Sequence, residues 1–154
     1  MTTATHTRAF LGAVAVILSA IIALAPGGAA LAQSPPAGMA RVWFLRQFTP
    51  GGSLATPWIY INGAPLTTSQ PGTIFHHDLP PGTYNFAVES CGIDVNQTLT
   101  LQLPPGSQAD LEVQSLESMT PRDCPRGTST FYVRPIAPRF LQLYLPHLAN
   151  LGAR

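Results

Sequence analysis

The chain has 154 residues, of which 45% are hydrophobic and only 10% are charged, and its formal net charge at pH 7 is +1. It contains no lysine, and its arginines form no basic run, so the composition excludes the strongly basic surface that nucleic-acid-binding proteins use. We therefore expect no nucleic-acid partner.

The first 32 residues have the three-part pattern of a secretory signal peptide. Arg8 gives a short basic start, the apolar run 9–25 follows, and a Pro-Gly-Gly segment breaks that run. Small residues at Ala30 and Ala32 form a cleavage motif directly before Gln33, so we expect a leader that is removed after Ala32. An apolar run of about 17 residues also reaches the lower limit for spanning a bilayer, which leaves a retained membrane anchor as the alternative. The mature chain is then exported, to the periplasm or the cell exterior, and its about 120 residues suffice for one domain.

The first elements after the leader are a linker and two strands. Residues 33–39 contain two prolines and a glycine and predict an extended linker. The run 41–46 (Arg-Val-Trp-Phe-Leu-Arg) is almost entirely apolar, which is typical of a strand buried on both faces. Trp58–Ile61 predicts the next strand, and Asn62-Gly63 after it predicts a type I′ hairpin turn because both residues tolerate positive φ.

A Leu-Pro-Pro-Gly phrase occurs twice, at 79–82 and 103–106, with a shorter Gln-Pro-Gly variant at 70–72. In such a phrase proline presets φ at the second turn position and glycine supplies positive φ at the third. We therefore expect type II turns in which Gly82 and Gly106 have positive φ.

Two strands flank these phrases with strict alternation, which predicts one buried and one solvated face. The apolar positions are Tyr84, Phe86 and Val88 and Leu99, Leu101 and Leu103, and between or beside them lie Asn85, Ala87, Glu89, Thr98, Thr100 and Gln102. Residues 110–116 and 130–134 supply two further strands. About seven short strands with a turn signal every 8–12 residues predict an all-β fold, a mainly antiparallel β-sandwich over residues 40–137.

Both cysteines, Cys91 and Cys124, lie in the exported part. In an oxidising compartment two cysteines without a third predict one disulfide, here closing a loop of about 34 residues. The spacing is not that of a Cys-x-x-Cys redox or metal motif.

Residues 138–154 change to a helical period and predict a helical segment packed on the sandwich. Pro138 suits a helix start, Gly152 suits a stop, and Pro146 leaves open whether there is one kinked helix or two short helical turns. The polar face lacks the cations of a membrane-surface helix. The apolar stripe consists of Phe140, Leu141, Tyr144, Leu145, Leu148 and Leu151.

His76-His77-Asp78 is the one cluster that suggests catalysis or metal binding. In a strand His76 and Asp78 face one side and His77 the other, so at most two could share a ligand, and His147 is the only other histidine after the leader. We therefore expect no catalytic residue, no metal and no cofactor. The alternative is a small secreted hydrolase that uses these histidines and nearby carboxylates.

The aromatic residues offer a better candidate site. Trp43, Trp58 and Tyr60 exceed what one small core accommodates, so we expect one or two of these rings to present a flat surface for a sugar or a protein. We expect a contact set of these three residues with Arg46 at the rim.

The stretch 41–89 resembles an uncharacterised, lipoprotein-like family of bacterial envelope proteins. The resemblance consists of a strand ending in Arg (41–46), a strand closing on Asn-Gly (59–63) and a Pro-Pro-Gly-x-Tyr phrase (80–84). The last phrase is similar to PEGA and carboxypeptidase-regulatory β-sandwiches, which are accessory domains without catalysis of their own. Members often carry a lipidation cysteine at the end of the leader, and this chain has none there. The resemblance implies a fold and a compartment and transfers no functional residues.

Together these features predict an exported, non-catalytic β-sandwich module of the cell envelope. It would bind a protein or glycan partner or have a structural role, and it would contact the membrane only if the leader is retained.

Overall fold

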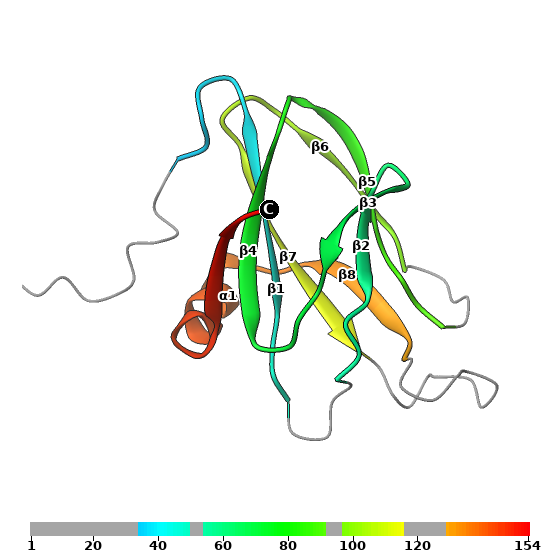
Figure 1. Cartoon of the computed structure of the whole chain (residues 1–154). Helices are drawn as coiled ribbons and strands as arrows, with labels where there is room; N and C mark the ends of the chain where they lie inside the picture. Colours follow the sequence, from blue (N-terminus) through cyan, green and yellow to red (C-terminus); the bar gives the residue numbers. More distant parts are fainter. Residues whose placement is uncertain (1–33, 50–53, 92–96, 116–128) are drawn as a thin grey trace, which may run out of the picture.

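The computed structural model describes residues 34–49, 54–91, 97–115 and 129–154, which form two packed β-sheets (Figure 1). The predicted leader lies outside the described residues. The five-stranded sheet comprises β1 (Ala40–Arg46), β4 (Thr73–Leu79), β7 (Gln108–Ser115), β8 (Phe131–Pro135) and β9 (Ala149–Ala153). The four-stranded sheet comprises β2 (Trp58–Ile61), β3 (Ala64–Thr68), β5 (Gly82–Val88) and β6 (Leu99–Leu103). Between β8 and β9 lie helix α1 (Pro138–Tyr144) and the 3₁₀ helix η3 (Leu145–His147).

The strand orders are β8-β7-β1-β4-β9 in the five-stranded sheet and β3-β2-β5-β6 in the four-stranded sheet. Within the described part of the chain, five of the seven strand pairings are antiparallel, while β1–β7 and β4–β9 are parallel. The predicted all-β, mainly antiparallel sandwich is therefore confirmed, with nine described strands where about seven were expected.

Strand β1 is buried along its whole length, as its apolar sequence predicted. One of its faces, with Val42 and Phe44, contributes to the core between the two sheets. Phe44 stacks on Phe75 of β4, with 5.2 Å between ring centroids, and meets the edge of Phe86 of β5 at 5.8 Å. The contact between Phe44 and Phe86 joins the two sheets, because β1 and β5 belong to different layers, whereas the contact with Phe75 lies within one sheet.

The other face of β1 packs against the C-terminal segment. Trp43 and Leu45 form a second buried cluster with Ile74 of β4 and Leu141 of α1. In Figure 1, α1 lies on the opposite side of β1 and β4 from β2, β3 and β5. The molecule thus has three layers at this point: the four-stranded sheet, the five-stranded sheet and α1.

Three of the predicted turns have the expected backbone. Asn62 (φ 51°) and Gly63 (φ 80°) form the turn between β2 and β3, so the predicted hairpin is confirmed. Gly72 (φ 72°) and Gly106 (φ 73°) have the positive φ that the proline-glycine phrases predicted.

The prediction of positive φ for Gly82 is wrong. Gly82 is instead the first residue of β5 and lies beneath the ring of Tyr84. A Cβ atom at this position would lie 3.3 Å from Cε2 of Tyr84. The Tyr84 hydroxyl donates a hydrogen bond to the carbonyl oxygen of Pro80 at 2.8 Å, which holds the ring across the corner. Glycine at this position allows the Tyr84 ring to approach the backbone closely.

The prediction of a helical segment over the whole of 138–154 is wrong in its last third. The helical part ends with η3, which contains Pro146, and the chain continues as β9, parallel to β4. The N–H of Ala149 donates to the carbonyl of Gly72, and that of Arg154 to the carbonyl of His76, both at 2.9 Å. Hydrogen bonds to the edge of β4 outweigh the local helical period, because a strand edge leaves backbone groups to be paired.

Residues 34–39 form a hydrogen-bonded turn where an extended linker was expected. The N–H of Met39 donates to the carbonyl of Pro36 at 2.9 Å, and Gly38 has a φ of 79°. The carbonyl of Met39 in turn accepts from the N–H of Gly106 at 2.8 Å, which ties this turn to the one between β6 and β7.

Among the described residues, no helix is both long and apolar enough to cross a membrane.

Candidate functional site

The structure separates the four residues of the predicted contact set. Trp43 lies in β1 of the five-stranded sheet, whereas Trp58 and Tyr60 lie in β2 of the four-stranded sheet. Trp43 is only 1% exposed, because α1 covers the face of the sheet on which it lies. The prediction that Trp43 contributes to the same surface as Trp58 and Tyr60 is therefore wrong.

Arg46 does not lie at a solvated rim, which corrects the second part of that prediction. Its side chain is buried, and Nη1 donates to the carbonyl oxygens of Ala55 at 2.5 Å and of Ser69 at 3.0 Å. The guanidinium carbon lies 4.9 Å from the ring centroid of Phe131. Burial lowers the pKa of Arg46, although a guanidinium stays protonated in proteins. Arg46 thus holds together the segments before β2 and after β3.

Trp58 and Tyr60 lie on the face of the four-stranded sheet that points away from the core. The residue between them, Ile59, is fully buried in the core, and Ile61 packs against the same core. Because alternate side chains of a strand face opposite sides, Trp58 and Tyr60 point outward. Trp58 is 43% exposed and Tyr60 is half-buried.

The neighbouring strands add small polar groups to this outward face. Tyr84, Phe86 and Val88 of β5 and the three leucines of β6 point into the core, so the residues that alternate with them point outward. We call the resulting surface the neutral face; it consists of Trp58, Tyr60, Thr83, Asn85, Ala87, Thr100 and Gln102.

A direct contact confirms that β5 and β6 contribute to one face. The side-chain amide of Asn85 donates to Oγ1 of Thr100 at 3.2 Å, across the pairing of β5 with β6. On the other side of β5, Ala87 lies opposite Tyr60 in the pairing of β2 with β5. The direct cross-strand neighbour of Tyr60 on β5 is therefore only a methyl group.

The neutral face is named for its charge. None of the four strands of this sheet contains a charged residue. Glu89 follows the last residue of β5 and lies beside Trp58. Its Oε2 accepts a hydrogen bond from the backbone N–H of Trp58 at 3.1 Å. Six charged residues belong instead to the strands of the five-stranded sheet: Arg41, Arg46, Asp78, Asp110, Glu112 and Arg134.

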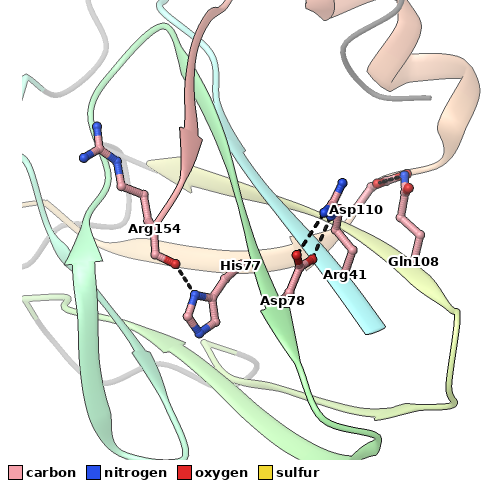
Figure 2. Close-up of polar contacts among 6 residues, drawn as sticks. All are labelled: Arg41, His77, Asp78, Gln108, Asp110 and Arg154. Carbon is pink, nitrogen blue, oxygen red and sulfur yellow. Dashed lines mark hydrogen bonds and ion pairs between the residues drawn. The ribbon is translucent and has the colours of Figure 1, made fainter. Parts of the chain in front are cut away.

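An ion pair occupies the outer face of the five-stranded sheet. Arg41 donates to Asp78 from Nε to Oδ1 at 2.7 Å and from Nη2 to Oδ2 at 2.9 Å (Figure 2). This hydrogen bonding lowers the pKa of Asp78 and raises that of Arg41. Asp110 lies near this pair and accepts from the side-chain amide of Gln108 at 2.9 Å, while burial raises the pKa of Asp110.

The two neighbouring histidines do not form a common site. His76 lies against Trp43, with ring centroids 4.6 Å apart, on the side of β4 that carries Asp78. His77 points to the other side of β4, and its Nδ1 donates to the backbone oxygen of Arg154 (Figure 2). Removal from water, and then the charge of Arg41, lower the pKa of His76. Two histidines on opposite sides of a strand cannot act together on one substrate.

Two buried side-chain nitrogen atoms, one on β1 and one on β4, have no hydrogen-bond partner in the protein. They are Nε1 of Trp43 and Nδ1 of His76. An indole nitrogen can only donate a hydrogen bond, and a neutral imidazole nitrogen can accept one, so the two atoms are complementary in their hydrogen-bonding capacity. Within the described ranges, no group of three or more histidine, cysteine or acidic side chains is placed to hold a metal ion.

Cys91 lies beside the segment that follows Cys124 in the chain. Its backbone N–H donates to the carbonyl of Ser129 at 3.2 Å, and the hydroxyl of Thr130 donates to its carbonyl at 3.1 Å. Cys124 itself is outside the described residues, so its disulfide with Cys91 stays a prediction.

The sequence contained a signal for the part of the neutral face that the predicted contact set left out. Asn85, Ala87, Thr100 and Gln102 occupy the polar positions of two strands whose alternation was clear. What the alternation could not show is that these strands pair beside β2 and extend the surface of Trp58 and Tyr60.

No protein-family model matches the chain, and no curated protein matches it.

Proposed function

We propose that this protein is an exported, non-catalytic binding module of the cell envelope, which holds a protein or glycan partner on the neutral face. The single observation that carries the proposal is the 43% exposure of Trp58 on a sheet whose four strands contain no charged residue. An accessory role of this kind is also what the resemblance to PEGA-like and carboxypeptidase-regulatory-like sandwiches implies.

The two outer faces of the sandwich differ in a way that supports this assignment. The outer face of the five-stranded sheet is covered in part by α1 and otherwise carries an ion pair and the buried Glu112. The neutral face has exposed threonines, a glutamine and a tryptophan. Charged groups usually cover a solvated sheet face, and an exposed aromatic side chain on an uncharged one is typical of a contact surface.

The size of the neutral face predicts modest affinity. Three strands cover about 10 Å across the sheet, and five residues of a strand cover about 17 Å along it. A surface of this size contacts a short segment of a partner, with Trp58 as the side chain that contributes most.

Capture from native envelope extract tests the proposal. The exported protein is immobilised, and the captured component is identified by mass spectrometry and sugar analysis. Phe140 in α1 is the matched control, because it is an aromatic residue with 41% exposure on the other side of the molecule. We expect Trp58→Ala to abolish capture and Phe140→Ala to preserve it. Equal capture by both variants would show that the neutral face is not the binding surface.

Mass analysis of the N-terminus of the same preparation tests export. We expect the chain to begin at Gln33, and retention of residues 1–32 in the purified protein would contradict cleavage after Ala32.

A further inference from the structure

We infer that the neutral face binds an uncharged polysaccharide built of pyranose sugars. This inference rests on the proposed function and deepens it by naming the partner class.

The first argument is the arrangement of the two aromatic side chains. Trp58 and Tyr60 lie two residues apart in β2 and point to the same side, which separates them by about 7 Å along the strand. Both rings are rigid and apolar, and each has a polar tip that reaches water. The C–H face of a pyranose ring is likewise flat and apolar, so successive sugars of one chain can lie over the two rings.

The second argument is the space beside Tyr60. Ala87 of β5 lies opposite Tyr60, and its methyl group is too small to cover the ring. A leucine or a longer side chain at this position would fill the place of a sugar. The direct cross-strand partner of Tyr60 on β5 therefore leaves room for a ligand beside the ring.

The third argument is the chemistry of the surrounding polar groups. Thr83, Asn85, Thr100 and Gln102 carry hydroxyl and amide groups, which both donate and accept hydrogen bonds. Sugar hydroxyls have the same dual capacity. The contact between Asn85 and Thr100 orients one amide and one hydroxyl before a ligand arrives, which reduces the entropy that binding must overcome.

The fourth argument is charge. An acidic polysaccharide would find no cation on the four strands of this sheet and would meet the carboxylate of Glu89 beside Trp58. The centre of a protein interface is enriched in aromatic residues, Met and Arg, and the neutral face has no such residue besides Trp58 and Tyr60. Hydroxyls and amides around two aromatic rings favour an uncharged sugar chain.

Fluorescence quenching of the full exported protein provides the test, because the two tryptophans differ in exposure. Trp43 is buried, so added acrylamide quenches chiefly Trp58. The probes are the hexasaccharides of glucose (β-1,4 and α-1,4 linked), of mannose and of N-acetylglucosamine, with polygalacturonate as the acidic comparison. We expect at least one uncharged hexasaccharide to protect Trp58 from acrylamide, and its affinity to be insensitive to salt.

Four variants distinguish a sugar stacked on the rings of Trp58 and Tyr60 from a sugar bound elsewhere on the molecule. Isothermal titration calorimetry measures binding to the variants, because the two Trp58 variants lack the fluorophore that reports on the site. Trp58→Ala should weaken the binding of that hexasaccharide about tenfold or more, whereas Trp58→Phe should retain much of it. Ala87→Leu should weaken it by covering Tyr60. Phe140→Ala should leave it unchanged, and circular dichroism shows that each variant is folded.

The outcomes distinguish failure of this inference from failure of the proposed function. If none of the uncharged hexasaccharides protects Trp58, or only polygalacturonate does, the partner class is wrong. The proposed function would still stand if an envelope component is captured in a Trp58-dependent way. If a hexasaccharide binds equally well to Trp58→Ala, the neutral face is not its site and this inference is wrong. The proposed function is wrong as well only if capture of the envelope component is also unchanged in Trp58→Ala.

Discussion

Breaking the ion pair between Arg41 and Asp78 should destabilise the fold much more than a surface ion pair would. The change Asp78→Asn keeps the shape of the side chain and removes its charge. Arg41 is only 6% exposed at its side chain and Asp78 is 21% exposed, and two hydrogen bonds join them. The variant therefore leaves a buried guanidinium, 6.0 Å from the ring of Trp43, without its carboxylate.

The magnitude follows from the burial of the two side chains. A solvent-exposed pair contributes about 0–1 kcal/mol, and removal of one partner from a fully buried pair costs about 3–5 kcal/mol. The exposure of Asp78 allows water to replace part of the lost interaction, so we expect Asp78→Asn to lower the free energy of unfolding by about 2–3 kcal/mol. For a domain of this size the melting temperature should fall by roughly 10 °C.

Guanidinium denaturation followed by circular dichroism measures this difference at neutral pH. The double variant Arg41→Met with Asp78→Asn is the control, because it removes the buried guanidinium charge as well as the carboxylate. We expect the double variant to recover about 1 kcal/mol or more relative to Asp78→Asn alone. A loss below about 0.5 kcal/mol for Asp78→Asn would refute the reasoning, since ordinary surface substitutions cause changes of that size.

The same pair predicts a pH dependence with a definite sign. The pKa of Asp78 is lower in the folded state than the value of about 3.9 in an unfolded chain. The stabilisation is therefore complete above about pH 3.9 and is lost as the pH falls through the lower, folded pKa. Asp78→Asn should remove this part of the acid sensitivity, which denaturation across the acidic range would measure.

Four further changes have defined outcomes. The pKa of His76 is lowered in the fold, so its contribution to the free energy of unfolding is complete above about pH 6.5 and falls below that pH as the unfolded chain gains a proton. His76→Phe should reduce this dependence of the free energy of unfolding on pH, which denaturation curves between about pH 7 and pH 5 measure. Burial raises the pKa of Asp110, so its charge disfavours folding at neutral pH, and Asp110→Asn should raise the melting temperature; a lower one would contradict this. Gly106→Ala should cost about 1–2 kcal/mol in chemical denaturation, because φ is 73° and only the backbone opposes a methyl group there. Reduction should lower the melting temperature without abolishing the β-sheet signal, and two free thiols at Cys91 and Cys124 under denaturing, non-reducing conditions would contradict the predicted disulfide.

The sequence by itself determined the class of fold and three of the local turns. The apolar run of β1 predicted burial on both faces, and the structure confirms it because one face meets the other sheet and the other face meets α1. Asn62-Gly63 predicted its hairpin since few residue pairs tolerate two consecutive positive φ angles. The alternation in β5 and β6 separated core from surface positions correctly. Such features are encoded within a few neighbouring residues, so they can be recognised without knowledge of the rest of the fold.

Tertiary structure alone decided which strands share a sheet, and with that the composition of the candidate site. Period-2 alternation states that a strand has two faces but not which strand lies beside it. Trp43 and Trp58 both lie in short apolar runs of the sequence. Trp43 is nevertheless buried beneath α1 and Trp58 is exposed on the neutral face, because β1 and β2 belong to different sheets. The last strand, β9, was hidden for a related reason: the exposed edge of β4, which is distant in the sequence, supplies the hydrogen bonds that turn a helical pattern into a strand.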